Sequence, residues 1–337
     1  MQWQQQLDLQ HLNTFHIQAF ATEYTYIETL TDITEAIQYA QKKQQSLRIL
    51  GGGSNVLLTQ DIKDLLLINR LRGIALVNED EEVIDLQCMS GEAWHDCVMW
   101  AVERGYGGIE NLSLIPGTAG AAPIQNIGAY GVECKDVLLR LSAINLQDAS
   151  LHEFTAADCR FGYRDSIFKQ EARNQYFIIS ITLRLQKNPT YHIDYGNIRE
   201  ELTAQGVETL SVKAVSDAVM SIRRRKLPDP AKIGNAGSFF KNPVISQDHY
   251  QELKTKFPNM PSFVSGHEVK IPAAWLIESC GWKGFREGDY GVHTQQALCL
   301  VNYNQAKGTQ ILELSTRIMD AVLAQFNIQL EREVNIW

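Results

Sequence analysis

Apolar residues recur at helical spacing in several segments of the chain. Between Asp32 and Gln45 the apolar positions are spaced by three or four residues, which predicts an amphipathic helix. We expect Asp32 and Glu35 to form a capping box at its start, where backbone N–H groups lack partners within the helix. The same spacing predicts helices at 211–225 and 309–326. A further helix is predicted at 92–104, which Gly105 ends, and another at 272–281, which opens with Pro272 and ends at Gly281.

Short apolar runs between these segments predict strands. They lie at 47–50, 56–58, 65–68, 83–86 and 176–185. The last residues, 330–337, alternate between polar and apolar and are also expected to be extended. This mixture of helices and strands indicates α+β domains.

The 337 residues exceed what one hydrophobic core usually organises. The breaker Leu227-Pro228-Asp229-Pro230 indicates a domain edge close to it. The predicted division is 1–70, 71–222 and 223–327, followed by a terminal strand at 328–337.

Composition narrows the classes of function. Hydrophobic residues make up 45% of the chain, charged residues 21%, and the net charge is -8, which disfavours a nucleic-acid surface. No secretory signal and no apolar run of membrane-spanning length occur, so we expect a cytoplasmic protein. The six cysteines form no CxxC pair, which predicts buried, reduced thiols and no metal site.

Two glycine-rich segments are the first candidates for chemistry. They are Gly51-Gly52-Gly53-Ser54-Asn55 and the nearly uncharged stretch 115–131. Glycine lets a backbone approach a ligand and present N–H groups to phosphate oxygens, although a simple tight turn explains the triplet equally well. Neither segment is a Walker loop or a dinucleotide-binding fingerprint. Two such segments suit a long ligand with a pyrophosphate and a planar ring, such as a flavin dinucleotide.

Three polar residues are candidates for catalysis, each with a plainer alternative. Arg164 could be a surface arginine paired with Asp165, Ser238 a turn serine, and Glu333 a solvated strand residue. Lys226 ends a basic run at the end of a predicted helix, where the helix dipole alone favours positive charge.

Six segments taken together carry a resemblance to a known family. They are RILGGGSNVLL, LIPGTAGAAPIQNIGAYGVE, FGYRDSIFK, RRRKLPDP, GNAGSFFKNP and EREV, in this order along nearly the whole chain. In these motifs the chain resembles UDP-N-acetylenolpyruvoylglucosamine reductase, also called UDP-N-acetylmuramate dehydrogenase. The resemblance implies an FAD-binding fold of the vanillyl-alcohol-oxidase type in two α+β subdomains, with a C-terminal α+β domain that binds substrate.

The resemblance also implies roles for individual residues. Ser238 would be the proton donor, with Arg164 and Glu333 beside it; Glu331 lies on the same strand face and is the alternative to Glu333. Non-covalent FAD would contact Gly51, Gly52, Gly53, Ser54, Asn55, Gly117, Thr118, Gln125, Asn126, Gly128 and Ala129. The substrate would contact Tyr195, Lys226, Lys241 and Asn242, with Tyr195 on a substrate-covering loop.

The implied reaction is the reduction of UDP-N-acetylglucosamine enolpyruvate by NADPH through FAD, a step in peptidoglycan precursor synthesis and hence in cell-wall growth, cell shape and division. The partners would be small molecules only, and we expect a monomer. Two other readings stay open: an oxidase of the same flavin superfamily, and a nucleotide-sugar-binding regulator that keeps the fold without the chemistry.

Overall fold

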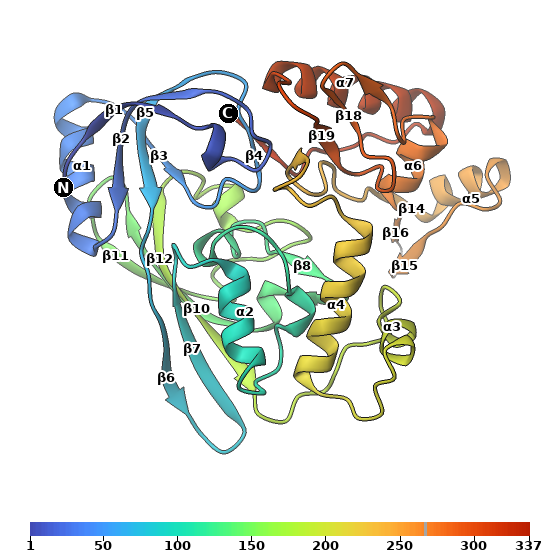
Figure 1. Cartoon of the computed structure of the whole chain (residues 1–337), viewed down its shortest axis with the longest axis horizontal. Coiled ribbons are helices and arrows are strands. Elements are labelled where there is room, and N and C mark those ends of the chain that lie inside the picture. The colour runs from blue at the N-terminus through green and yellow to red at the C-terminus, as the bar shows by residue number, and fades with distance from the viewer. Residues whose placement is uncertain (266–267) are drawn as a thin grey trace. The chain divides into compact units, whose positions relative to one another are not determined.

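The computed structural model describes residues 1–265 and 268–337 (Figure 1). It groups the chain into two compact units. Unit 1 comprises Met1–Leu7, Ala21–Gly52 and Ile62–Arg225, and unit 2 comprises Asp8–Phe20, Gly53–Asp61 and Lys226–Trp337. The chain therefore passes between the units several times, including once within the glycine triplet.

The first sheet of unit 1 has four strands in the order β1-β2-β5-β3. Their bounds are Gln4–Asp8, Phe20–Ile27, Ile62–Asn69 and Leu47–Leu50. β2, β5 and β3 run parallel. Helix α1, Leu30–Lys43, buries Ile33 and Ile37 in one core with Leu67 of β5, which confirms the predicted amphipathic helix.

The start of α1 differs from the prediction. Thr29 is the N-cap, and the capping box joins Thr29 to Asp32 instead of Asp32 to Glu35. The Asp32 carboxylate accepts from the N–H of Thr29 at 2.8 Å, while Glu35 pairs with the N-terminal ammonium at 3.0 Å. The prediction placed the N-cap three residues too late. Leu30, the first residue of the helix, is exposed and so does not belong to the buried apolar face from which the helix was predicted.

The second sheet of unit 1 is antiparallel, in the order β11-β10-β12-β7-β6. The strands span Leu151–Thr155, Leu138–Asn145, Tyr176–Gln186, Val83–Met89 and Ile74–Glu79. Helix α2, Trp94–Val102, lies over the long strands (Figure 1) and shares their core. Trp94 is fully buried, and its indole N–H donates to the carbonyl of Leu112 at 3.0 Å.

Two short strands and two helices follow in unit 1. Strands β8, Gly128–Ala129, and β9, Val132–Glu133, form a two-stranded turn. Helices α3, Ile198–Ala204, and α4, Val212–Lys226, pack through an apolar cluster of their own. Glu201 of α3 also accepts from Arg225 and Ser221 of α4, at 2.7 and 2.6 Å.

Within the residues that the structure describes, unit 2 contains three small sheets and three α-helices. The sheet β13-β19-β18-β17 comprises Gly234–Asn235, Leu300–Asn302, Tyr290–Val292 and Arg286–Glu287. The sheet β14-β16-β15 comprises Val244–Ser246, Glu268–Lys270 and Phe263–Ser265. The helices are α5, Gln247–Lys256, α6, Ala273–Ser279, and α7, Gly308–Phe326, and α7 packs on β18 and β19.

The predicted C-terminal strand is shorter than expected. Only β20, Asn335–Ile336, is a strand, and it pairs in parallel with β4, Val56–Leu57. Arg332 forms an isolated bridge with Phe240, so residues before β20 still pair with a second segment.

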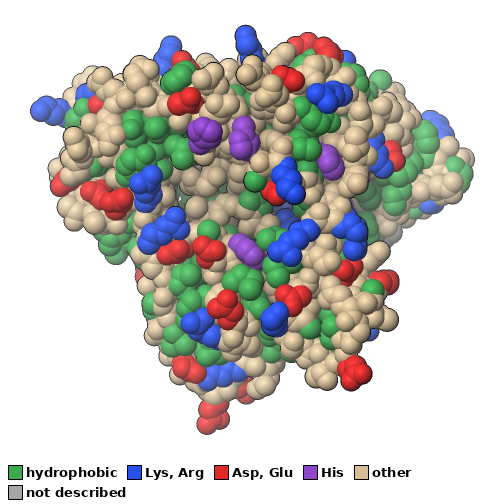
Figure 2. Space-filling view, viewed as in Figure 1, with side chains coloured by type: hydrophobic (Ala, Val, Ile, Leu, Met, Phe, Trp, Pro, Cys, Tyr) green, Lys and Arg blue, Asp and Glu red, His purple; other side chains and the backbone are tan. Residues whose placement is uncertain are grey.

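On the face drawn in Figure 2, basic and acidic side chains are interspersed. Five of the six cysteines are buried, as predicted, and burial raises the pKa of Cys159 to about 12. Within residues 1–265 and 268–337, no helix has the length and apolar character needed to cross a membrane.

Candidate active site

In unit 1, Gly51 and Gly52 of the first glycine-rich segment lie against Gly117 and Thr118 of the second. A Cβ added at Gly52 would be 3.0 Å from the Cα of Gly117, and one added at Gly51 would be 2.6 Å from the Thr118 hydroxyl oxygen. The triplet is thus a turn between β3 and β4, and also a place where two backbones meet without side chains between them. Such an approach leaves room for backbone groups to contact a pyrophosphate.

The second glycine segment is fixed by hydrogen bonds from both sides. The carbonyl of Gly117 accepts from the N–H of Trp94 at 3.0 Å, and the N–H of Ala119 donates to the carbonyl of Glu92 at 2.8 Å. Trp94 is the first residue of α2, and Glu92 lies two residues before it. The segment is therefore held by the same helix that packs on the long sheet.

Just before this segment, Leu114 has a left-handed backbone with φ of 57°. Its N–H donates to Nδ1 of His95 at 3.1 Å, and its carbonyl accepts from the Arg223 guanidinium at 3.2 Å. An acceptor at Nδ1 requires an imidazole that is unprotonated there. Burial lowers the pKa of His95, with Arg224 and Arg223 adding to the effect, which favours this neutral form.

Asn126 is fully buried, and its side chain is used within the protein. Its Nδ2 donates to the Glu133 carboxylate and to the carbonyl of Gly162, both at 3.0 Å, and its Oδ1 accepts from the N–H of Lys135 at 3.0 Å. Asn126 therefore shapes the loop through its side chain.

Arg164 lies beside this loop. Its guanidinium donates to the carbonyl of Gly128 at 2.5 Å and to that of Asn126 at 3.4 Å, and it lies 3.8 Å from the Glu133 carboxylate. The side chain is only 18% exposed, so Arg164 is not a surface arginine. Its own backbone is left-handed, with φ of 55°, a strained conformation for a residue other than glycine.

A pocket of about 340 Å³ adjoins the predicted tyrosine loop. It is lined by Tyr130, Gly131, Thr190, Tyr191, His192, Asp194 and Tyr195. Tyr195 is half exposed, and Gly196 lies so close to the Tyr130 ring that a Cβ there would be 2.6 Å from it. Tyr130 was not among the predicted site residues; a tyrosine between Ala129 and Gly131 gives no local sign of its contact with a segment over sixty residues away.

In unit 2, Ser238 follows Gly237, whose φ is 70° and whose N–H donates to Oδ1 of Asn235 at 2.9 Å. Phe239 and Phe240 are buried, and Phe239 packs edge-on against Phe15. The two aromatic residues thus anchor the segment in the core, and Ser238 is left half-buried at its end.

The Ser238 segment pairs with the segment that carries Glu333. The N–H of Glu333 donates to the carbonyl of Phe239, and the N–H of Lys241 to that of Glu331, both at 2.9 Å. Glu333 therefore lies at the Ser238 end of this short ladder. Glu331 lies at the other end, where its carboxylate is 2.5 Å from the ammonium of Lys241.

Asn55, Asn242 and Lys226 are further residues of unit 2 that were predicted for the site. Asn55 donates to the carbonyl of Glu333 at 3.4 Å, and both residues belong to unit 2. Asn242 accepts from the N–H of Ala273 at 2.9 Å and so caps α6. Lys226 is exposed at the end of α4.

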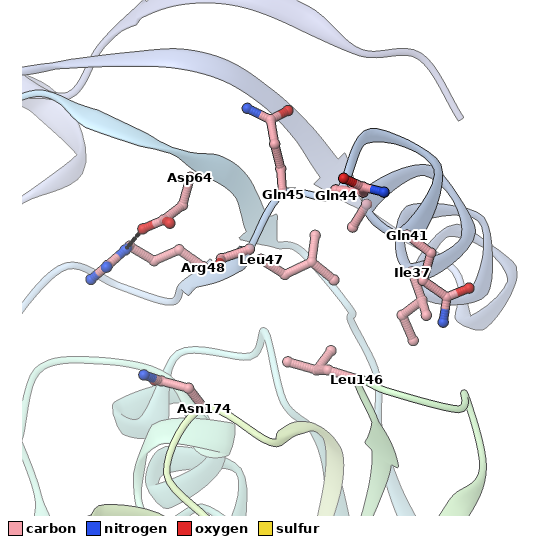
Figure 3. Close-up of a pocket in the computed structure, with 11 residues that line it drawn as sticks. Ile37, Gln41, Gln44, Gln45, Leu47, Arg48, Asp64, Leu146 and Asn174 are labelled. Carbon is pink, nitrogen blue, oxygen red and sulfur yellow. Dashed lines mark hydrogen bonds and ion pairs between the residues drawn. The ribbon is translucent and has the colours of Figure 1, made fainter.

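A second pocket, of about 450 Å³, lies in unit 1 between the end of α1 and β3. Figure 3 shows the ion pair of Arg48 and Asp64, 2.6 Å apart, at one end and Ile37 and Leu146 at the other. None of the residues predicted for the site lines it. Among the described residues, no group of three or more His, Cys, Asp or Glu could hold a metal ion.

Two family models match the chain. Residues 22–155 match an FAD binding domain, and residues 229–337 match the C-terminal domain of UDP-N-acetylenolpyruvoylglucosamine reductase. The crystal structure of the reductase of that name from Thermus caldophilus aligns over 100% of this chain and 99% of its own, with a TM-score of 0.70 and 21% identity. The expected α+β FAD-binding fold of the vanillyl-alcohol-oxidase type, followed by a C-terminal α+β domain, is confirmed.

Relatives at higher identity cover the whole chain. UDP-N-acetylenolpyruvoylglucosamine reductase of Pseudomonas putida is 44% identical over 100% of this chain and 99% of its own length. The protein of the same name from Flavobacterium johnsoniae is 43% identical, with 100% of both chains covered. The chain therefore belongs to the UDP-N-acetylenolpyruvoylglucosamine reductase family and is an FAD-dependent oxidoreductase.

Proposed function

We propose that the protein reduces UDP-N-acetylglucosamine enolpyruvate to UDP-N-acetylmuramate with NADPH, through non-covalently bound FAD, in peptidoglycan precursor synthesis. The observation that carries the proposal is the guanidinium of Arg164, which lies 2.5 Å from the carbonyl of Gly128, a residue within the matched FAD binding domain. A cation held beside a cofactor loop suits a substrate whose reacting carbon carries a carboxylate.

The glycine segments fit FAD. The closeness of Gly52 to Gly117, where even one Cβ would be tight, supports a role for both in binding the pyrophosphate. FAD, when bound, supplies hydride transfer between NADPH and the enolpyruvyl double bond. The proposed FAD contacts are Gly51, Gly52, Gly53, Ser54, Asn55, Gly117, Thr118, Gln125, Asn126, Gly128 and Ala129.

Arg164 would bind the substrate carboxylate and stabilise the negative charge that develops on it during reduction. A planar guanidinium can hold both carboxylate oxygens at once, and this interaction strengthens as charge accumulates. Glu333, if protonated, would donate a further hydrogen bond to the same group. The engagement of Glu331 with Lys241 supports Glu333 as the residue in this role.

Ser238 would supply the proton to the carbon next to the carboxylate. A neutral hydroxyl is a weak acid, so an adjacent group or an ordered water must replace the proton as it leaves. The hydrogen bond between the Phe239 carbonyl and Glu333 supports this assignment, because it puts the serine and the glutamate on neighbouring segments.

Tyr195, Lys226, Lys241 and Asn242 would bind the nucleotide sugar, with the half-exposed Tyr195 on a loop that covers it. The pyrophosphate of the substrate would compete with Glu331 for Lys241. We further propose that the protein is cytoplasmic, since both substrates are soluble nucleotides made inside the cell. We also propose that it is a monomer.

Product formation tests the proposal. Purified protein with FAD, NADPH and UDP-N-acetylglucosamine enolpyruvate should yield a compound heavier by two hydrogen atoms, as measured by mass spectrometry, with one NADPH consumed for each product. Rapid oxygen consumption with an alcohol and no product from the enolpyruvyl ether would instead favour an oxidase.

A further inference from the structure

Asn111 is a buried amide at the meeting point of two loops of unit 1. It lies in the short 3-10 helix Glu110–Leu112 and is 1% exposed. Its Nδ2 donates to the carbonyl of Tyr130 at 2.9 Å and to that of His192 at 2.7 Å. One nitrogen thus joins segments that are 19 and 81 residues away along the chain.

The donor geometry is specific to an amide. Bridging two carbonyls requires two N–H groups on one atom, which leucine or aspartate cannot provide. The Oδ1 atom of Asn111 is buried and accepts no hydrogen bond within the described residues. Burying an unpaired acceptor is unfavourable, which indicates that the position requires the donors.

The backbone that carries Asn111 is firmly held. The buried carboxylate of Glu110 accepts from the N–H of Gly108 at 2.6 Å, and the hydroxyls of Ser113 and Ser216 are 2.8 Å apart. Ser216 belongs to α4. The amide therefore projects from a fixed support toward the two loops.

The loop on the far side of this bridge carries Tyr195. Ile193, one residue after His192, is buried with Ile198 of α3, and Gly196 lies on the Tyr130 ring. These contacts and the amide bridge hold the segment 192–196 against the Tyr130 turn. The side chain of Tyr195 remains half exposed at the edge of the 340 Å³ pocket.

We propose that Asn111 is a positioning residue for substrate binding. Its amide holds the Tyr195 loop against the Tyr130 turn, in the position from which Tyr195 covers the nucleotide sugar. This inference rests on the proposed function. Asn111 contacts neither reacting group, so its effect should fall on substrate affinity and leave reduction of FAD by NADPH unchanged.

The test compares Asn111→Leu and Asn111→Asp with Asn304→Leu, a matched control at an exposed asparagine of unit 2. Both Asn111 variants should raise KM for the enolpyruvyl substrate about tenfold, with kcat changed much less. Amide hydrogen exchange in 190–196 should accelerate, and anaerobic reduction of FAD by NADPH should keep its wild-type rate. The control should match wild type in all three.

Several outcomes would overturn the inference. Unchanged KM in a folded variant, with or without faster exchange, would remove the role in substrate binding. If the rate of FAD reduction by NADPH fell as much as the affinity for the enolpyruvyl substrate, the role of Asn111 would be merely structural. If Asn111→Leu does not fold, Asn111→Ser, which retains one donor, should give a smaller shift in both KM and exchange, and no shift would contradict the inference. Failure of wild type to reduce the substrate would refute the proposed function alone, since the exchange measurement tests the bridge independently.

Discussion

Gly52 and Gly51 differ in what a side chain would meet, and this difference gives a prediction. A Cβ at Gly52 meets the backbone of Gly117, whereas one at Gly51 meets a hydroxyl that can rotate away. Gly52→Ala should therefore weaken FAD binding by at least about tenfold, or about 1.4 kcal/mol. Gly51→Ala should lose less. Titration of the apoprotein with FAD measures both, and equal affinities would contradict the account of the loop contact.

The lowered pKa of His95 predicts that the stability of the protein depends on pH. Burial lowers its pKa below the ordinary 6.5, so the unfolded chain takes up the proton first as the pH falls. The stabilisation from neutral His95 is complete above pH 6.5 and is lost as the pH falls from there through the lowered pKa. The free energy of unfolding and the retained FAD should both decrease over this range, because a proton on Nδ1 removes the acceptor for Leu114.

The control for this prediction is His95→Asn, which keeps an acceptor oxygen and does not titrate. His293 also has a pKa lowered by burial, and it remains in both proteins. The variant should lose less stability on acidification than wild type does. Identical pH profiles would show that His95 has no part in the effect.

At the residue scale, local motifs marked candidate residues in the sequence but not the contacts that these residues make. The glycine segments and Arg164 were evident in the sequence, but the partners of Arg164 were not, because Gly128 lies 36 residues away along the chain. Asn111 and Tyr130 gave no local signal at all. Their roles depend on contacts between distant segments, which no spacing rule encodes.

At the scale of elements, the start of α1 offers a prediction. Thr29→Ala removes the N-cap side of the capping box and should destabilise the helix by about 1 kcal/mol. Thr31→Ala, at an exposed position inside the helix, should change stability much less. Hydrogen exchange of the first α1 amides measures the difference, and equal protection in the two variants would contradict the assigned cap.

The long amphipathic helices were predicted with nearly correct bounds because each buries one apolar face. The predicted 309–326 is found as α7, Gly308–Phe326, and the predicted 211–225 as α4, Val212–Lys226. Strand β6, Ile74–Glu79, was missed because five of its six residues are exposed and give no alternation. Helix α3 was missed because seven residues are too few to establish a period.

At the scale of the whole molecule, FAD should stabilise the fold. A ligand that binds only the folded protein at one hundred times its Kd adds about 2.7 kcal/mol of stability. Removing FAD should therefore lower Tm, and added FAD should restore it. Riboflavin, which lacks the pyrophosphate, should restore less, and full restoration by riboflavin would argue against phosphate binding at the glycine segments.

The most direct test of the proposed reaction separates its two halves under anaerobic conditions. NADPH should bleach the yellow FAD of the wild-type protein, and UDP-N-acetylglucosamine enolpyruvate should then restore the colour. Ser238→Ala should bleach at the wild-type rate and recover the colour at least about a hundredfold more slowly, whereas Ser262→Ala should behave like wild type. Recovery at the wild-type rate in Ser238→Ala would exclude the serine as proton donor, and bleaching of wild type without any recovery would contradict the proposed substrate.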